Sequence, residues 1–202
     1  RKTSGTVTLT ANWSANTYTI NYELNGGSYG SSHPTNGTYD SNVTINNPTK
    51  EGYTFRGWSI NGYDETAKHG TSENAVTNTI ASTNTLIKST YFKNLRKTSG
   101  TVTLTANWSA NTYTINYVLN NGSYGTNHPT TGTFDSVVTI DNPTRIGYTF
   151  AGWTLSGYDS TARHGNSSNE VTSTIASTST LIKSTYFKNL RKTSGTVTLT
   201  AN

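Results

Sequence analysis

The chain contains neither cysteine nor methionine among its 202 residues. The absence of cysteine excludes disulfide bonds, a thiol nucleophile and cysteine-ligated zinc. Charged residues make up only 12% of the chain, unlike a typical cytosolic surface. No run approaches the roughly 20 apolar residues that span a membrane, and no signal peptide is visible. We therefore expect no membrane insertion by this segment, and any export signal or anchor to lie outside it.

The few charges are unevenly placed and give a net charge of +5. Ten of the 15 basic residues lie in residues 86–97, in the copy at 181–192, and at Arg1-Lys2. A basic, aromatic-bearing patch could bind nucleic acid. The spacing of Leu86, Tyr91 and Leu95 instead favours a helix with solvated lysines, which requires no ligand. We expect no nucleic-acid partner, while weak attraction to anionic cell-wall polymers remains open.

Repetition is the strongest signal that is present. Residues 1–12 return at 96–107 and again at 191–202, a period of 95 residues. A fixed period of this kind indicates an array of modules. Identity is complete between 1–22 and 96–117 and between 85–107 and 180–202, so the sequence around the junction of two modules varies least.

The 13 tyrosines, five phenylalanines and four tryptophans provide core-forming side chains, and the richness in threonine favours strands. Val7, Leu9 and Trp13 alternate with polar residues, which predicts a half-buried strand over 6–13. Because this sequence recurs at the end of each period, it is interpreted as the closing strand of a preceding module. The predicted division is 1–15 for that strand, 16–109 for the first module and 110–202 for the second.

Two local features complete the expected module. In a regular strand Tyr53 and Phe55 would face one side of the sheet and Trp58 the other. One extra residue, in a glycine bulge at Arg56-Gly57, would return Trp58 to the buried side. The apolar residues spaced through 73–97 permit one or two short helices. Trp13, Trp58 and their counterparts Trp108 and Trp153 are predicted to be core residues.

The motifs resemble the Listeria–Bacteroides repeat of bacterial surface proteins. They are Tyr18–Tyr22 followed by Asn25-Gly26-Gly27, the run Pro48–Trp58, and Val102–Trp108. The second module repeats the central motif as Pro143–Trp153. The module is longer than the usual repeat, with the excess at 61–97. The resemblance implies an α+β, mostly β, β-grasp-like fold with a small mixed sheet. In that fold the first and last strands are parallel neighbours, so linked modules would stack into a rod.

No catalytic, cofactor or metal site is predicted. Asp64 and His69 recur as Asp159 and His164 but lack a third ligand or nucleophile at a recognisable spacing. We interpret the aspartate as a turn cap and the histidine as locally packed. His33-Pro34 and its copy are interpreted as loop-forming. A lysine–asparagine isopeptide bond remains open, although none of the five glutamates is kept between modules. The loop residues that could contact a ligand are Tyr29, Tyr63, His69, Tyr124, Tyr158 and His164.

The leading functional hypothesis is a structural module of an extracellular bacterial adhesin or fibre stalk that acts as a semi-rigid spacer and projects a distal domain. Its first partners would be neighbouring modules of the same chain. One alternative is an adhesive module whose variable loops bind a glycan or a host surface protein. Another is a filament subunit that assembles by strand exchange. An enzyme is not expected.

Overall fold

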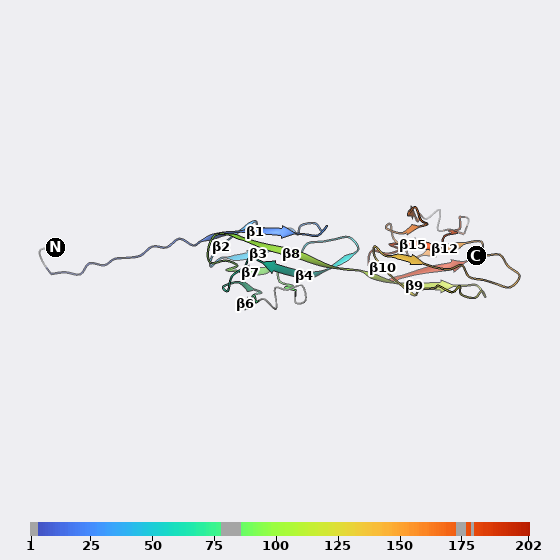
Figure 1. Ribbon diagram of the computed structural model, residues 1–202, viewed down its shortest axis with the longest axis horizontal. Coiled ribbons are helices and arrows are strands. Elements are labelled where there is room, and N and C mark those ends of the chain that lie inside the picture. The colour runs from blue at the N-terminus through green and yellow to red at the C-terminus, as the bar shows by residue number, and fades with distance from the viewer. Residues whose placement is uncertain (1–3, 78–85, 173–176, 179) are drawn as a thin grey trace. The chain divides into compact units, whose positions relative to one another are not determined.

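The computed structural model describes residues 4–77, 86–172, 177–178 and 180–202. Every regular element among these residues is a β-strand, and they contain no helix (Figure 1). The helices predicted within 73–97 are therefore wrong for the described part of that segment, and the class there is all-β instead of α+β. Residues 78–85 of that prediction lie outside the described residues.

The reason for this correction is visible at Tyr91–Lys93. These residues form strand β7, which pairs with β3 and β5. Phe92 is buried, whereas Tyr91 is exposed, so alternate residues face the core, as a strand requires. The apolar residues that suggested a helix include Ile87, Phe92 and Leu95, which are all fully buried. Each contacts the core separately, and their spacing only resembles that of a helix.

Contacts divide the chain into two compact units. The first contains residues 1–25, 29–48 and 57–107, and the second contains 26–28, 49–56 and 108–202. This division does not follow the sequence period throughout, because residues 49–56 of the first repeat cluster with the second unit.

The first repeat has two small sheets. The larger has the order β2-β1-β8-β4 and the smaller the order β3-β7-β5-β6. The strands of the larger sheet are β1 (Thr17–Glu23), β2 (Asn36–Thr38), β4 (Tyr53–Asn61) and β8 (Thr101–Ala110). The strands of the smaller sheet are β3 (Asn42–Thr44), β5 (Lys68–His69), β6 (Asn74–Ala75) and β7 (Tyr91–Lys93).

The second repeat has the same two sheets, in the orders β10-β9-β16-β12 and β11-β15-β13-β14. The larger contains β9 (Thr112–Val118), β10 (Thr131–Thr133), β12 (Trp153–Ser156) and β16 (Thr196–Ala201). The smaller contains β11 (Val137–Thr139), β13 (Arg163–His164), β14 (Asn169–Glu170) and β15 (Tyr186–Lys188).

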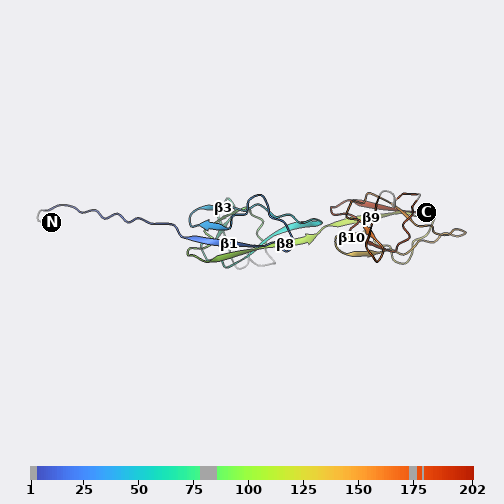
Figure 2. The ribbon, with the colours of Figure 1, turned by 90° about the horizontal axis from the view of Figure 1, so that it is seen from above.

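The first and last strands of each repeat are parallel neighbours, as the family resemblance implied. β1 pairs with β8 over five residues, Thr19–Glu23 against Thr101–Thr105, and Figure 2 shows the two side by side. β9 pairs with β16 in the same way. β2 and β10 add antiparallel edges, so each larger sheet is mixed.

The two sheets of the second repeat share one core. Its buried cluster includes Ile115, Trp153 and Leu199 from the larger sheet and Val138 and Phe187 from the smaller. Threonine and asparagine occupy many of the alternating outward positions of these strands. A low fraction of apolar residues is therefore enough to form a core, because only one face of each strand needs apolar side chains.

The tryptophan prediction is confirmed for Trp58 and Trp153, each only 1% exposed. The predicted break in strand alternation before Trp58 is also confirmed. Gly57 and Trp58 are both buried, and Gly57 has a φ of 128°. A side chain at Gly57 would approach Leu86 and the carbonyl of Ile87.

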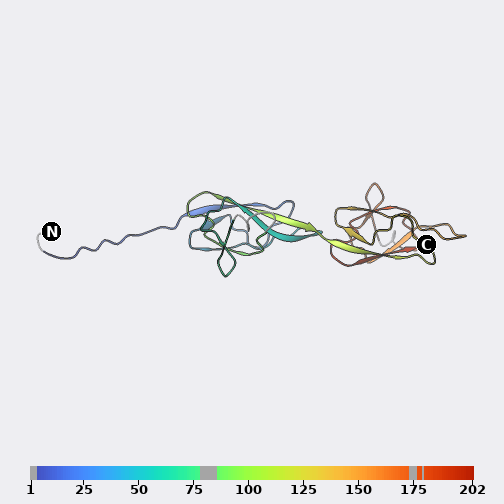
Figure 3. The ribbon, with the colours of Figure 1, turned by 60° about the horizontal axis from the view of Figure 1, so that its bottom comes forward.

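Residues 4–16 form no strand (Figure 3). Leu9 is 93% exposed and Trp13 92% exposed, so the core position predicted for Trp13 is wrong in this chain. The identical sequence at 101–110 forms β8, in which Leu104 is fully buried. A strand needs a hydrogen-bonding neighbour. Within the described residues the second and third occurrences have one, as β8 beside β1 and β16 beside β9, and the first has none.

A glycine covered by a tyrosine fixes the edge of each larger sheet. Gly132 of β10 lies opposite Tyr113 of β9, and a Cβ at Gly132 would collide with the Tyr113 ring. Gly37 and Tyr18 repeat the arrangement. This pairing was not anticipated from the sequence.

We predict that Gly132→Ala lowers the free energy of unfolding by about 1–3 kcal/mol, the usual cost of overpacking. The same substitution in a Tyr113→Leu background should cost less, because the branched side chain leaves room for the methyl group. Urea denaturation of the four chains of this double-mutant cycle measures the coupling. Additive effects would contradict the steric explanation.

Candidate interaction surfaces

Asp64 caps a turn, as its spacing suggested. Its Oδ1 accepts hydrogen bonds from the backbone N–H of Thr66 at 3.3 Å and the Thr66 hydroxyl at 2.5 Å. Its Oδ2 accepts one from the backbone N–H of Lys97 at 2.7 Å. Partial burial alone would raise the pKa of Asp64, but these hydrogen bonds outweigh it and lower the pKa. Asp159 repeats the arrangement with Thr161 and Lys192.

His69 lies in β5 and is half-buried, with Phe92 opposite it on β7. Its Nε2 is buried and has no hydrogen-bond partner among the described residues. Burial lowers the pKa of this imidazole. His164 has the same environment and the same direction of shift. Across the described ranges no group of three or more His, Asp or Glu side chains is placed to hold a metal ion.

Tyr29 forms a small aromatic cluster with its own repeat. Its ring stacks on His33 at 4.4 Å and 18°, and meets the edge of Tyr22 at 5.8 Å. The hydroxyl of Tyr22 donates to the carbonyl of Pro34 at 2.7 Å. Burial, followed by the proximity of Tyr29, raises the pKa of Tyr22. Tyr29 is still 53% exposed, so it presents an aromatic edge at the surface.

The cluster recurs in the second repeat as Tyr124 on His128 at 4.4 Å, with Tyr117 at 5.7 Å. The other candidate tyrosines lie elsewhere. Tyr63 and Tyr158 are half-buried, and Tyr158 packs against the core of its unit. The structure therefore brings Tyr29 and Tyr124 each together with a histidine of its own loop.

A surface that the sequence did not suggest is made by residues 49–56, which belong to the second compact unit. The carbonyl of Gly52 accepts a hydrogen bond from the backbone N–H of Asn111 at 2.9 Å. The Thr54 hydroxyl donates to Oδ1 of Asn111 at 2.6 Å. The ring of Phe55 meets that of Trp108 at 5.4 Å. This segment is therefore tied to the end of β8 and to Asn111, which lies between β8 and β9.

Tyr53 is the centre of this contact. Its ring packs edge-on against Phe134 at 5.8 Å, and its hydroxyl donates to Oδ2 of Asp135 at 2.7 Å. That hydrogen bond is the main cause of the lowered pKa of Asp135 and of the raised pKa of Tyr53. Glu51 adds an ion pair with Lys192 at 2.9 Å. The motif on which the family resemblance rests thus also makes packing contacts.

Gly52 permits the close approach. It has a φ of 76°, and a Cβ there would collide with the ring of Phe134. Gly147, its counterpart in the second repeat, has a φ of 77° but nothing within 4 Å of the Cβ position. Substitution of Gly147 therefore tests the free-energy cost of a side chain in this backbone conformation alone. Substitution of Gly52 adds the cost of the collision with Phe134.

We predict that Gly147→Ala costs about 1 kcal/mol, from the left-handed backbone alone. Gly52→Ala should cost about 1–3 kcal/mol more, because the methyl group also displaces Phe134. Urea denaturation of the two single variants gives the comparison. Equal losses of unfolding free energy would show that the Gly52–Phe134 contact contributes nothing.

The half-buried histidines predict a pH dependence. Folding lowers the pKa of His69 and His164 below the ordinary 6.5. As the pH falls, these histidines are therefore protonated at a higher pH in the unfolded chain than in the folded chain. Their contribution to the free energy of unfolding is complete above pH 6.5 and is lost as the pH falls towards the folded pKa values. We expect the free energy of unfolding to fall between about pH 7.5 and about pH 5, and the slope to flatten in the His69→Gln, His164→Gln double variant. An unchanged slope would contradict this origin.

Comparison with known proteins places these features in a family. Two relatives from Evansella cellulosilytica bear the names of membrane proteins. One is 34% identical over 151 residues, covering 72% of this chain and 19% of the relative. The other, named as Gly-rich, is 32% identical over 123 residues, covering 59% of this chain and 11% of the relative. The chain thus spans less than a fifth of either. Within its described part, no helix has the length and hydropathy needed to cross a bilayer.

One solved structure, domains 3–4 of the Streptococcal High Identity Repeats in Tandem of a cell surface protein, aligns over 92% of this chain and 96% of that one. Its identity is 12% and its TM-score 0.23, too low to establish a common fold. The family model of the Listeria–Bacteroides repeat domain matches residues 18–87 and 113–182, more than half of the chain. The chain belongs to the Listeria–Bacteroides repeat family and carries two copies of its domain.

Proposed function

We propose that this chain is a structural spacer of an extracellular bacterial surface protein. In this proposal its repeats form part of a stalk that projects a distal domain and carries tension along the polypeptide. Its first partners are neighbouring repeats of the same protein.

The observation that carries the proposal is the parallel pairing of the first and last strands in each repeat. A chain that enters through β9 and leaves through β16 is pulled at opposite ends of that pair. The ladder hydrogen bonds lie across the direction of pulling, so they must break together. In an antiparallel terminal pair they would break one at a time.

The cell-surface location rests on the family and its relatives. Both Evansella relatives are named as membrane proteins and are much longer than this chain, which fits a repeat segment within a large envelope protein. The absence of cysteine means that disulfide bonds do not contribute to this fold. Anionic cell-wall polymers could associate weakly with a chain of net charge +5.

The adhesive alternative has less support. Tyr29 and Tyr124 are the most exposed of the six candidate residues, but each already stacks on a histidine of its own loop. The strand-exchange alternative draws on the exposed residues 4–16, which have the sequence of a closing strand. Neither alternative accounts for the parallel terminal strands.

The spacer proposal predicts a directional resistance to force. Because the chain has no cysteine, paired cysteine handles can be introduced without competing thiols. Pulling a Thr112→Cys, Asn202→Cys variant loads β9 and β16 in shear. Pulling a Val118→Cys, Asn202→Cys variant opens the same pair from one end. Single-molecule force spectroscopy should show a severalfold higher unfolding force in the first geometry, and equal forces would argue against a tension-bearing role.

A further inference from the structure

We propose that residues 144–151 of the second repeat form a docking loop that binds the amino-terminal face of a second copy of this chain. That receiving face consists of Asn16, Tyr39, Asp40 and Lys97. The inference deepens the proposed function and rests on it, because it names the surface by which one copy would follow another.

The template for this contact is within the second compact unit. There, residues 49–56 pack on Asn111, Phe134, Asp135 and Lys192. A shift of one 95-residue period turns 49–56 into the docking loop. Gly147, Tyr148, Thr149 and Phe150 preserve the four residues that make the backbone, aromatic and hydroxyl contacts.

The turn of the docking loop has the conformation of the template turn without its contacts, although residues 148–151 lie outside β12 whereas the corresponding residues 53–56 lie in β4. In both segments a tyrosine N–H bonds back to a basic residue's carbonyl, Tyr53 to Lys50 and Tyr148 to Arg145, each at 3.1 Å. The side chain of that basic residue covers the tyrosine ring at 4.2 Å and 3.8 Å respectively. The loop is therefore preorganised, which reduces the entropy lost on binding.

Its side chains are exposed to an unusual degree for apolar residues. Tyr148 is 66% exposed and Ile146 is 99% exposed. A hollow of about 160 Å³ beside Tyr148 is lined in part by Pro143, Phe150 and Asn202. Gly147 faces open space, whereas Gly52 is buried against Phe134. A patch with these properties marks an interaction site.

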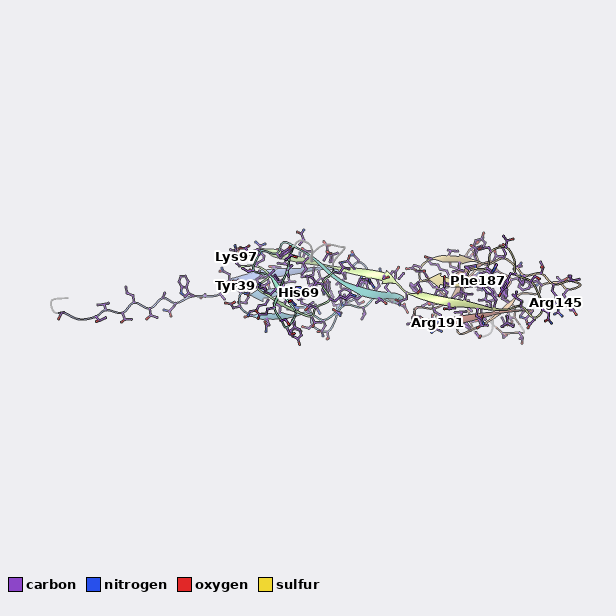
Figure 4. The ribbon with its side chains drawn as sticks, turned by 90° about the horizontal axis from the view of Figure 1, so that it is seen from below. Tyr39, His69, Lys97, Arg145, Phe187 and Arg191 are labelled. Carbon is purple, nitrogen blue, oxygen red and sulfur yellow. The ribbon has the colours of Figure 1, made fainter. Side chains whose placement is uncertain are left out.

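The receiving face is built like the face that the template segment contacts. The Asn16 side chain donates to the carbonyl of Lys97 at 2.9 Å, and Asn111 donates to that of Lys192 at 2.7 Å. The backbone N–H of Asp40 bonds to Asn94 at 2.6 Å, and that of Asp135 bonds to Asn189 at 2.6 Å. Figure 4 labels Tyr39 and Lys97 of this face and Arg145 of the docking loop.

Four substitutions distinguish the docking contact from its template: Arg145 for Lys50, Ile146 for Glu51, Ala151 for Arg56 and Tyr39 for Phe134. Two of them change groups that make the contact. Tyr39 replaces Phe134, which keeps an aromatic ring for Gly147 and Tyr148 to pack against. Ile146 replaces Glu51, so the ion pair with lysine is lost, and Lys97 instead pairs with Glu65 in its own repeat. We therefore expect a contact of the same geometry that is weaker than the template.

Sedimentation equilibrium of the whole chain tests the proposal up to about 1 mM, the effective concentration that a short linker gives to neighbouring modules. Reversible head-to-tail association is expected. Gly147→Ala should weaken it by about tenfold, because the methyl group collides with Tyr39 and displaces the carbonyl hydrogen bond to Asn16. Asp40→Ala, on the receiving face, should also weaken it.

Gly165→Ala is the matched control. Gly165 has a φ of 73°, close to that of Gly147, and room for a methyl group, but lies in the turn between β13 and β14. Gly165→Ala should lower the free energy of unfolding as Gly147→Ala does, and should leave association unchanged. A strictly monomeric chain at about 1 mM, or equal effects of the two alanine variants, would overturn the proposal.

A gain of affinity provides the complementary test. Ile146→Glu restores the residue of the template and should tighten association at low salt, whereas Val137→Glu, at another exposed apolar site, should not. Association that survives Gly147→Ala but is lost on deleting residues 1–15 would instead identify strand exchange. If the chain does not associate, the force measurement on β9 and β16 is unaffected. The docking proposal and the spacer proposal can therefore be contradicted independently.

Discussion

The parallel ladder between the first and last strands of each repeat is the interaction on which the other features depend. It joins segments about 80 residues apart in sequence, so neither larger sheet exists until the chain has passed through the whole repeat. Once formed, it places β1 or β9 at the centre of a mixed sheet and gives the smaller sheet a face to cover. The same ladder determines the direction in which the repeat resists tension.

No disulfide bond stabilises this ladder, because the chain has no cysteine. Each repeat obtains a core from alternate strand residues and one fully buried tryptophan. Glycines then permit three kinds of close approach: under the tyrosine at the sheet edge, at the break in strand alternation before the tryptophan, and against Phe134. The family motif around Gly52 and Tyr53 serves both folding and contact, because its turn presents the Tyr53 ring to Phe134 and the Gly52 carbonyl to the N–H of Asn111.

Much of the candidate chemistry could be predicted from spacing. The turn-capping Asp64 and the packed His69 followed from their position in a polar stretch without further ligands, and the buried Trp58 followed from alternation. The contact made by residues 49–56 could not be predicted, because each of its partners lies more than 50 residues away. The helix predicted in 73–97 was wrong because isolated core contacts on short strands can mimic a helical period.

The sequence by itself determined the period, the strand-rich composition, the buried face of the longer strands and the family. Tertiary structure decided which of those potential strands form. Residues 6–13 and 101–108 are identical, yet the first is exposed without a strand and the second is the buried part of β8. Likewise, Tyr53 is half-buried and Tyr148 exposed in the same turn. The physical reason is that strand hydrogen bonds and aromatic packing need a partner, and the local sequence does not supply one.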